Sequence, residues 1–180
     1  MFLPIIVAML LAQIPDAPVP KPSQPSSPQQ APSSEPYELQ GDKLGESVEA
    51  FMSQHPEAEC DNAQKPRTSC YQWRDVSIFG LSAHAGPGCN LKKRYAADCL
   101  QGITARFTDQ RLVSIVYTVA GTDKTEAAAA LKKKLGAPTM ESRDGTVWNS
   151  GNANASVVVG KAMEESDAPS LITISISIAN

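Results

Sequence analysis

LITISISIA (residues 171–179) is the stretch that decides the fold. Isoleucine occupies every second position from 172 to 178, and threonine or serine fills the positions between. Successive side chains of a β-strand point to opposite faces, so one face of this strand is apolar and the other is polar. This alternation is typical of an antiparallel sheet with one face on the core and the other in water.

Strand patterns also occur earlier in the chain. They cover residues 37–40, 76–81, 103–119, 146–150 and 155–161. The segment 103–119 predicts a hairpin that turns at Asp109 and Gln110. We expect a three-residue loop, which sets Ala105 opposite Val113 and keeps one face apolar, because a two-residue loop would mix the two faces.

Two helices are predicted, one ahead of each group of strands. The first carries Val48, Phe51, Met52 and His55 on one face, and Pro56 ends it. His55 is interpreted as a packing residue at the helix end. The second is predicted to begin with a capping box at Asp123 and Glu126, to continue through alanines 127–130 and to end at Gly136 and Pro138.

The order of helix and three strands, repeated once, predicts the fold class. We expect an α+β two-layer sandwich in residues 37–180, with two helices packed on one face of an antiparallel sheet. Residues 56–75 are polar and are interpreted as a loop, and AHAGPGCN (83–90) as a second loop.

The first 36 residues are not expected to belong to this domain. Residues 2–12 (FLPIIVAMLLA) form an uncharged apolar run, which predicts a signal peptide or N-terminal anchor and is too short to span a core of about 30 Å. Residues 13–36 are rich in Pro, Ser and Gln and predict a disordered linker. Whether the N-terminal segment is cleaved stays open.

The four cysteines favour an oxidising compartment. Cys60, Cys70, Cys89 and Cys99 predict two disulfides, and the equal spacing favours the two local pairs among three connectivities. Each pair would close a loop of about 11 residues and stabilise the fold by about 2.5–3 kcal/mol. The alternative is a zinc site with His84, although the close cysteine spacing of structural zinc sites is missing. We therefore expect a periplasmic, envelope or secreted protein.

Charge and composition exclude some functions. The net charge of −3 and the intermixed charged residues argue against nucleic-acid binding. The chain has two histidines, neither beside a recognisable nucleophile motif, and its cysteines are expected to be oxidised. We expect no enzyme, no catalytic residues, no metal and no cofactor.

The candidate binding residues are the aromatic and arginine side chains that interfaces favour. They are Tyr71, Trp73 and Arg74, in the predicted loop 56–75, and Trp148. Core packing is the alternative interpretation for each tryptophan.

Three short motifs carry a resemblance to a known family. LGESVE (44–49), FTDQRLV (107–113) and LGAP (135–138) resemble the helix start, hairpin and helix end of the small envelope lipoproteins of the SmpA/OmlA (BamE-like) family. A doubled unit of that kind is similar to the fold of the β-lactamase inhibitor protein. The lipoprotein cysteine is missing here, and Asp109 and Gln110 replace the usual glycine turn. The resemblance implies a binding or scaffolding role in the envelope.

These observations predict an exported, non-catalytic protein-interaction or scaffolding module with an unknown envelope or extracellular protein as its partner. A small-ligand or lipid carrier is the alternative, followed by a secreted hydrolase or hydrolase inhibitor. Membrane contact is expected only through an uncleaved N-terminal segment, if at all.

Overall fold

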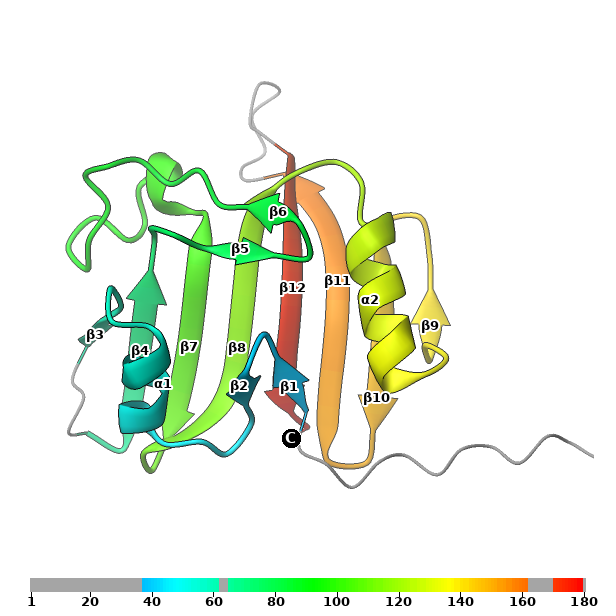
Figure 1. Cartoon of the computed structure of the whole chain (residues 1–180), viewed down its shortest axis with the longest axis horizontal. Helices are drawn as coiled ribbons and strands as arrows, with labels where there is room; N and C mark the ends of the chain where they lie inside the picture. The colour runs from blue at the N-terminus through cyan, green and yellow to red at the C-terminus, as the bar shows by residue number, and fades with distance from the viewer. Residues whose placement is uncertain (1–36, 62–64, 162–169, 180) are drawn as a thin grey trace, which may run out of the picture. The chain divides into compact units, whose positions relative to one another are not determined.

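The structure, a computed structural model, describes residues 37–61, 65–161 and 170–179 (Figure 1). These residues belong to one compact unit. The expectations for residues 1–12 and 13–36 therefore lie outside the described residues. Within the described ranges, every helix is too short or too polar to cross a bilayer.

An eight-stranded antiparallel sheet forms the body of the unit (Figure 1). Its strands are β3 (Glu59–Asp61), β4 (Arg67–Gln72), β7 (Gly102–Thr108), β8 (Arg111–Ala120), β9 (Met140–Glu141), β10 (Gly145–Ser150), β11 (Ala153–Lys161) and β12 (Ser170–Ile178). They lie side by side in the order β3-β4-β7-β8-β12-β11-β10-β9. The strand that comes last in the chain, β12, thus lies in the middle and joins two antiparallel groups.

Short elements cover one face of this sheet in pieces. They are the helices α1 (Val48–Gln54) and α2 (Thr125–Leu135) and two small hairpins, β1 (Glu38–Leu39) with β2 (Asp42–Lys43) and β5 (Ser77–Ile78) with β6 (Leu81–Ser82). Figure 1 shows all of them in front of the sheet. Leu39, Phe51, Ile78 and Leu131 reach from these elements into one hydrophobic core with the inner side chains of the sheet. We call the opposite side of the sheet the open face.

The period-two pattern of β12 is confirmed. Ile172, Ile174 and Ile176 are fully buried, whereas Ile178 at the strand end is 40% exposed. Ile174 lies between Tyr117 on β8 and Val157 on β11, so it is enclosed by buried neighbours on both sides. Each fully buried isoleucine contributes about 1.5–3 kcal/mol.

The expected fold class is wrong. The described part is mostly β, and the expected two-layer α+β sandwich does not form. The helices have only 7 and 11 residues and are too short to cover the eight-stranded sheet as a layer. The two small hairpins cover part of the same face of the sheet. Residues 76–81, expected to be one strand, contain β5 and the start of β6 instead. A positive φ at Phe79 and Gly80 makes the tight turn between them.

The prediction of a loop over residues 56–75 is also wrong, because this segment supplies β3 and β4. Thr68, Cys70 and Gln72 alternate toward the core, and two of these inward residues are polar. Polar residues on the inner face hid the alternation in the sequence.

The two predicted disulfides are confirmed. Cys60 lies directly opposite Cys70 in the β3–β4 pair, and Cys89 is bonded to Cys99, which leaves no free cysteine. The loop over residues 83–90 is confirmed as well, since it contains no helix or strand.

The β7–β8 hairpin has a two-residue turn, so the expected three-residue loop is wrong. Asp109 and Gln110 both have positive φ, which a type I′ turn requires. Thr108 pairs with Arg111, and a β-bulge then shifts the register so that Ala105 lies opposite Ile115. The extra residue of the bulge keeps the apolar side chains on one face.

The predicted ends of both helices are confirmed, whereas the predicted start of α2 is wrong. Ser47 caps α1 through a hydrogen bond from the Ala50 N–H to its Oγ, and His55 ends this helix. Gly136, with a φ of 82°, ends α2. The predicted capping box at Asp123 does not form, because Asp123 accepts from the N–H of Thr125, only two residues ahead.

Candidate functional site

Four side chains form a chain of contacts at one end of the open face: Trp73, Tyr71, Arg94 and Tyr95. We call this group the aromatic–arginine cluster. The rings of Tyr71 and Trp73 are stacked, with centroids 5.7 Å apart and planes 7° from parallel. The Arg94 Cζ atom lies 5.3 Å from the ring centroid of Tyr71 and 5.0 Å from that of Tyr95. Both distances allow cation–π attraction.

The cluster is built from two segments that are fixed in different ways. Tyr71 follows the inward Cys70 on β4 and therefore points to the open face. Trp73 is only 7% exposed and donates its Nε1–H to the Cys99 carbonyl at 3.1 Å. The Cys89–Cys99 disulfide closes the loop that carries Arg94 and Tyr95. The inner end of the cluster is thus buried, while Tyr95 at its outer end is 79% exposed.

A hollow of about 220 Å³ adjoins the cluster and extends over β7 and β8. Arg94, Arg106, Gln101, Thr104 and Thr118 supply its polar lining, which contains no acidic residue. The strands β4 and β7 approach closely here. A Cβ atom at Gly102 would lie 2.2 Å from the Gln72 carbonyl oxygen, so only glycine fits at that position.

The structure places the four predicted binding residues differently. Tyr71 and Trp73 belong to the cluster. Arg74 is exposed and donates to the Pro87 carbonyl oxygen at 2.9 Å, outside the cluster. Trp148 is 2% exposed and donates to the Gly136 carbonyl oxygen, so it packs in the core at the end of α2.

Sequence reasoning missed Arg94, Tyr95 and Arg106. The signal for the first two was an adjacent arginine and tyrosine inside the loop between Cys89 and Cys99. Arg106 follows the buried Ala105 in the alternation of β7, so its place on the open face could have been read from the hairpin pattern.

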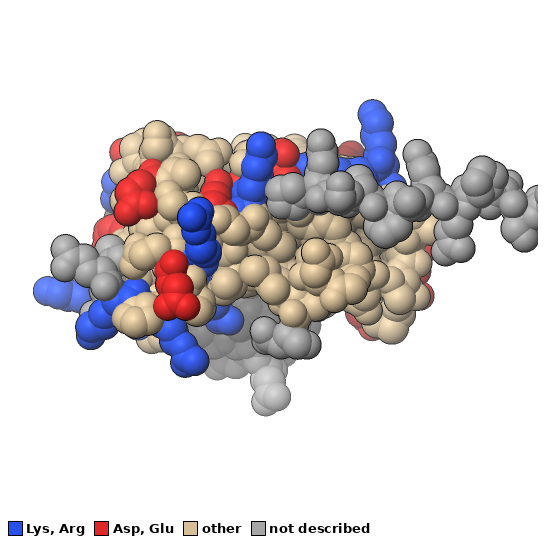
Figure 2. All heavy atoms as spheres, turned by 90° about the horizontal axis from the view of Figure 1, so that it is seen from below, with Lys and Arg blue, Asp and Glu red and all other residues tan. Residues whose placement is uncertain are grey.

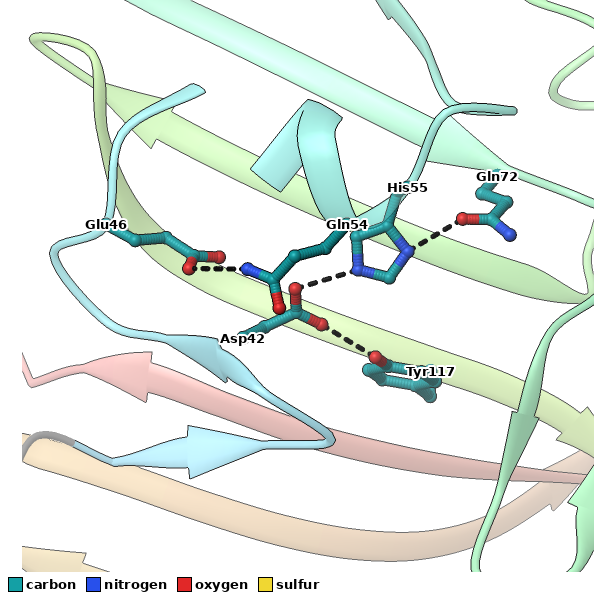
Figure 3. Close-up of polar contacts among 6 residues, drawn as sticks. All are labelled: Asp42, Glu46, Gln54, His55, Gln72 and Tyr117. Atoms are coloured by element: carbon teal, nitrogen blue, oxygen red, sulfur yellow. Dashed lines mark hydrogen bonds and ion pairs between the residues drawn. The ribbon is translucent and has the colours of Figure 1, made fainter. Parts of the chain in front are cut away.

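A second polar group lies under the small β1–β2 hairpin and connects four elements (Figure 3). The Asp42 carboxylate is completely buried and accepts from Tyr117 Oη on β8 at 2.7 Å. Its other oxygen lies 2.8 Å from His55 Nε2, at the end of α1. His55 Nδ1 lies 2.8 Å from Gln72 Oε1 on β4. We call these four residues the buried network.

The hydrogen bonds of the buried network define the charge of His55. The amide nitrogen of Gln72 donates to the Arg74 carbonyl oxygen, so its oxygen faces the histidine ring. Both ring nitrogens of His55 therefore meet acceptors and must both carry protons. Burial alone would lower the pKa of His55, but the hydrogen bond and charge of Asp42, the hydrogen bond of Gln72 and the charge of Glu46 raise it overall.

The pKa values of Tyr117, within the network, and of Glu46, beside it, are raised for the same reason. Burial, followed by the charge of Asp42, raises the pKa of Tyr117, which keeps its hydroxyl protonated as a donor. Burial and the charge of Asp42 also raise the pKa of Glu46, which accepts a hydrogen bond from Gln54. The buried network therefore contains an ion pair between Asp42 and His55 when His55 is protonated.

The buried network has the geometry of a structural connection. Neither ring nitrogen of His55 is left to accept a proton from a nucleophile, and the ring packs on Phe51 with centroids 4.3 Å apart. Among the described residues, the one group close enough to hold a metal is Cys89, Asp98 and Cys99. The two sulfurs are bonded to each other, so they are not thiolate ligands. The alternative of a zinc site with His84 is wrong for the same reason, because its cysteines are bonded in disulfides.

Comparison with known proteins assigns no family: no family model matches the chain, and no significant match to a curated protein or a solved structure was found.

Proposed function

We propose that this chain is an exported, non-catalytic protein-interaction module that binds its partner through the aromatic–arginine cluster. The observation that carries the proposal is the arrangement of Tyr95, Arg94 and Tyr71, in which an exposed aromatic ring lies on a guanidinium that is itself held on a second ring. Tyrosine, tryptophan and arginine dominate the binding energy of protein interfaces.

Export is supported by the sulfur chemistry. Both disulfides lie in the part of the unit that builds the cluster, one within the β3–β4 pair and one in the loop that carries Arg94. Disulfides persist in oxidising compartments and are rare in the cytosol. A partner in the envelope or outside the cell would meet the cluster in the compartment where it is stable.

An interaction module fits better than a carrier of apolar ligands. A hollow of about 420 Å³ near the start of α2 is lined mostly by polar and charged residues, among them Asp123, Lys124, Arg143 and Asp144. Lipid-binding sites need an apolar lining. The hollow beside the cluster has a polar lining as well and is smaller.

The test is capture of a partner by the full chain immobilised as bait in envelope extract, compared between variants. Tyr95→Ala is the informative change, because the side chain is exposed and its loss leaves the core intact. We expect it to weaken capture at least about 30-fold, the effect of an interface hot spot of about 2 kcal/mol. Met140→Ala is the matched control, since Met140 is 58% exposed at the other edge of the sheet. Equal capture by the wild type and Tyr95→Ala would refute the proposal.

A further inference from the structure

Charge is distributed unevenly over the open face. The outward side chains of β8, β12, β11 and β10 form three rows across the sheet. They are Ser114, Ser177, Asn154 and Asn149; Val116, Ser175, Ser156 and Val147; and Thr118, Thr173 and Val158. All of them are uncharged. Figure 2 views the unit from below Figure 1, so the open face is seen edge-on; at this end of the unit Lys, Arg, Asp and Glu gather mainly on the left.

Arg106 continues the first row on β7, and the row then runs through Ser69 to Asp61 on β3. Arg106 is exposed and lies between Ser69 on β4 and Ser114 on β8, neither of which offers a countercharge. Within the described residues Arg106 forms no ion pair. A guanidinium in this setting is available to an anion from outside the chain.

Arg94 supplies the second guanidinium of the same hollow and is already held in place. Tyr71 and Tyr95 contact it, and Asp61 forms an ion pair with it at 3.5 Å. Its Nε atom is buried and has no hydrogen-bond partner among the described residues. A side chain fixed in this way loses little further freedom on binding, which favours affinity.

The size of the hollow limits what can enter. About 220 Å³ is less than the roughly 300–1,000 Å³ of pockets that enclose small molecules, so it suits one side chain of a partner. Two guanidiniums with the hydroxyls of Thr104 and Thr118 nearby present donors. The carboxylate of Asp61 lies outside the lining and contacts only Arg94 of the two. Arginine binds carboxylates through paired, charge-assisted hydrogen bonds.

We propose that this hollow is the recognition subsite for an aspartate or glutamate side chain of the protein partner, bound by Arg106 and Arg94. The inference rests on the proposed function and deepens it, since it names an acidic segment as the part of the partner that enters. The uncharged rows beside the hollow then receive uncharged partner surface, so the two arginines alone select for the acidic residue.

The test uses the full chain and an acetylated, amidated tetraglutamate peptide, with tetraglutamine as the matched control. Binding is followed by NMR through the side-chain Nε–H signals of Arg94 and Arg106 and the indole N–H of Trp73. We expect tetraglutamate to shift these signals and tetraglutamine to leave them unchanged. Arg106→Gln should weaken tetraglutamate binding about tenfold or more. Arg143→Gln, which removes the same charge from an exposed position near α2, should have little effect.

Several results would overturn the subsite. One is an equal loss of tetraglutamate affinity in Arg106→Gln and Arg143→Gln. Another is that tetraglutamine shifts the NMR signals as much as tetraglutamate does. A third is that sodium phosphate binds as tightly as tetraglutamate. An unchanged Trp73 indole signal in unliganded Arg106→Gln shows that the variant is folded. Partner capture that needs Tyr95 but tolerates Arg106→Gln would remove the subsite and leave the proposed function standing. Peptide binding that depends on Arg106, together with partner capture that does not depend on Tyr95, would support the subsite and refute the proposed role of the cluster.

Discussion

Tyr117→Phe isolates one bond of the buried network. The phenyl ring fills the same core position, so the change removes only the hydroxyl that donates to Asp42 at 2.7 Å. Asp42 is completely buried, and water therefore cannot replace the lost donor without opening the β1–β2 hairpin. The carboxylate would keep His55 as its remaining side-chain partner.

The expected cost follows from these facts. A hydrogen bond to a charged group contributes about 1.5–3 kcal/mol, and removing one partner leaves the buried acceptor unsatisfied. We expect Tyr117→Phe to lower the free energy of unfolding by about that amount. For a urea dependence of about 2 kcal/mol per molar, the midpoint falls by roughly 1 M.

The assay is urea unfolding at pH 6, followed by the fluorescence of Trp73 and Trp148, which are both buried. Tyr37→Phe is the matched control, because Tyr37 packs partly against the core and its hydroxyl has no hydrogen bond among the described residues. The control should stay within about 0.5 kcal/mol of the wild type. A Tyr117→Phe value in that same range would show that the carboxylate of Asp42 does not depend on this donor, and the description of the network would be wrong.

Three further predictions concern stability. The pKa of His55 is raised in the folded state, so its ion pair stabilises the fold fully below the unfolded pKa of about 6.5 and is lost as the pH rises through the folded pKa. The wild type should therefore have a higher urea midpoint than His55→Gln at low pH, and this difference should shrink above neutral pH. In thermal unfolding, Gly102→Ala should lower the free energy of unfolding by more than about 3 kcal/mol, because the new Cβ would clash with the Gln72 carbonyl oxygen. Gly45→Ala should lower it by only about 1–2 kcal/mol, because its Cβ meets no atom and the positive φ of 88° is the single unfavourable factor. Reduction of both disulfides should lower the free energy of unfolding by about 5–6 kcal/mol. Circular dichroism should then show that the reduced protein unfolds near room temperature or at a much lower urea concentration.

The sequence predicted the elements whose inner faces are apolar. The alternating isoleucines of β12 and the Phe51 face of α1 were readable because periodicity and burial agree there. The local disulfides were readable because equal spacing brings each pair close along the chain.

Other features could not be predicted because they depend on tertiary contacts. Thr68 and Gln72 point inward, so β4 lacks an apolar stripe and resembles a loop. The burial of Asp42 follows from partners 13 and 75 residues away in the chain. The aromatic–arginine cluster likewise forms only after β4 and the loop closed by Cys89 and Cys99 come together. The fold class was wrong for this reason: β3 and β4 were assigned to a loop, and each of the two small hairpins was assigned to a single strand.

The central position of β12 has a consequence for biogenesis. Until this strand has left the ribosome, β8 and β11 cannot be joined through it, and each presents an unpaired edge. Residues 111–120 and 170–178 must then pair although they are far apart in the sequence. Such long-range pairing slows folding and leaves aggregation-prone strand edges exposed in the meantime. A nascent chain built in this order benefits from a chaperone that shields β8 until its neighbour arrives.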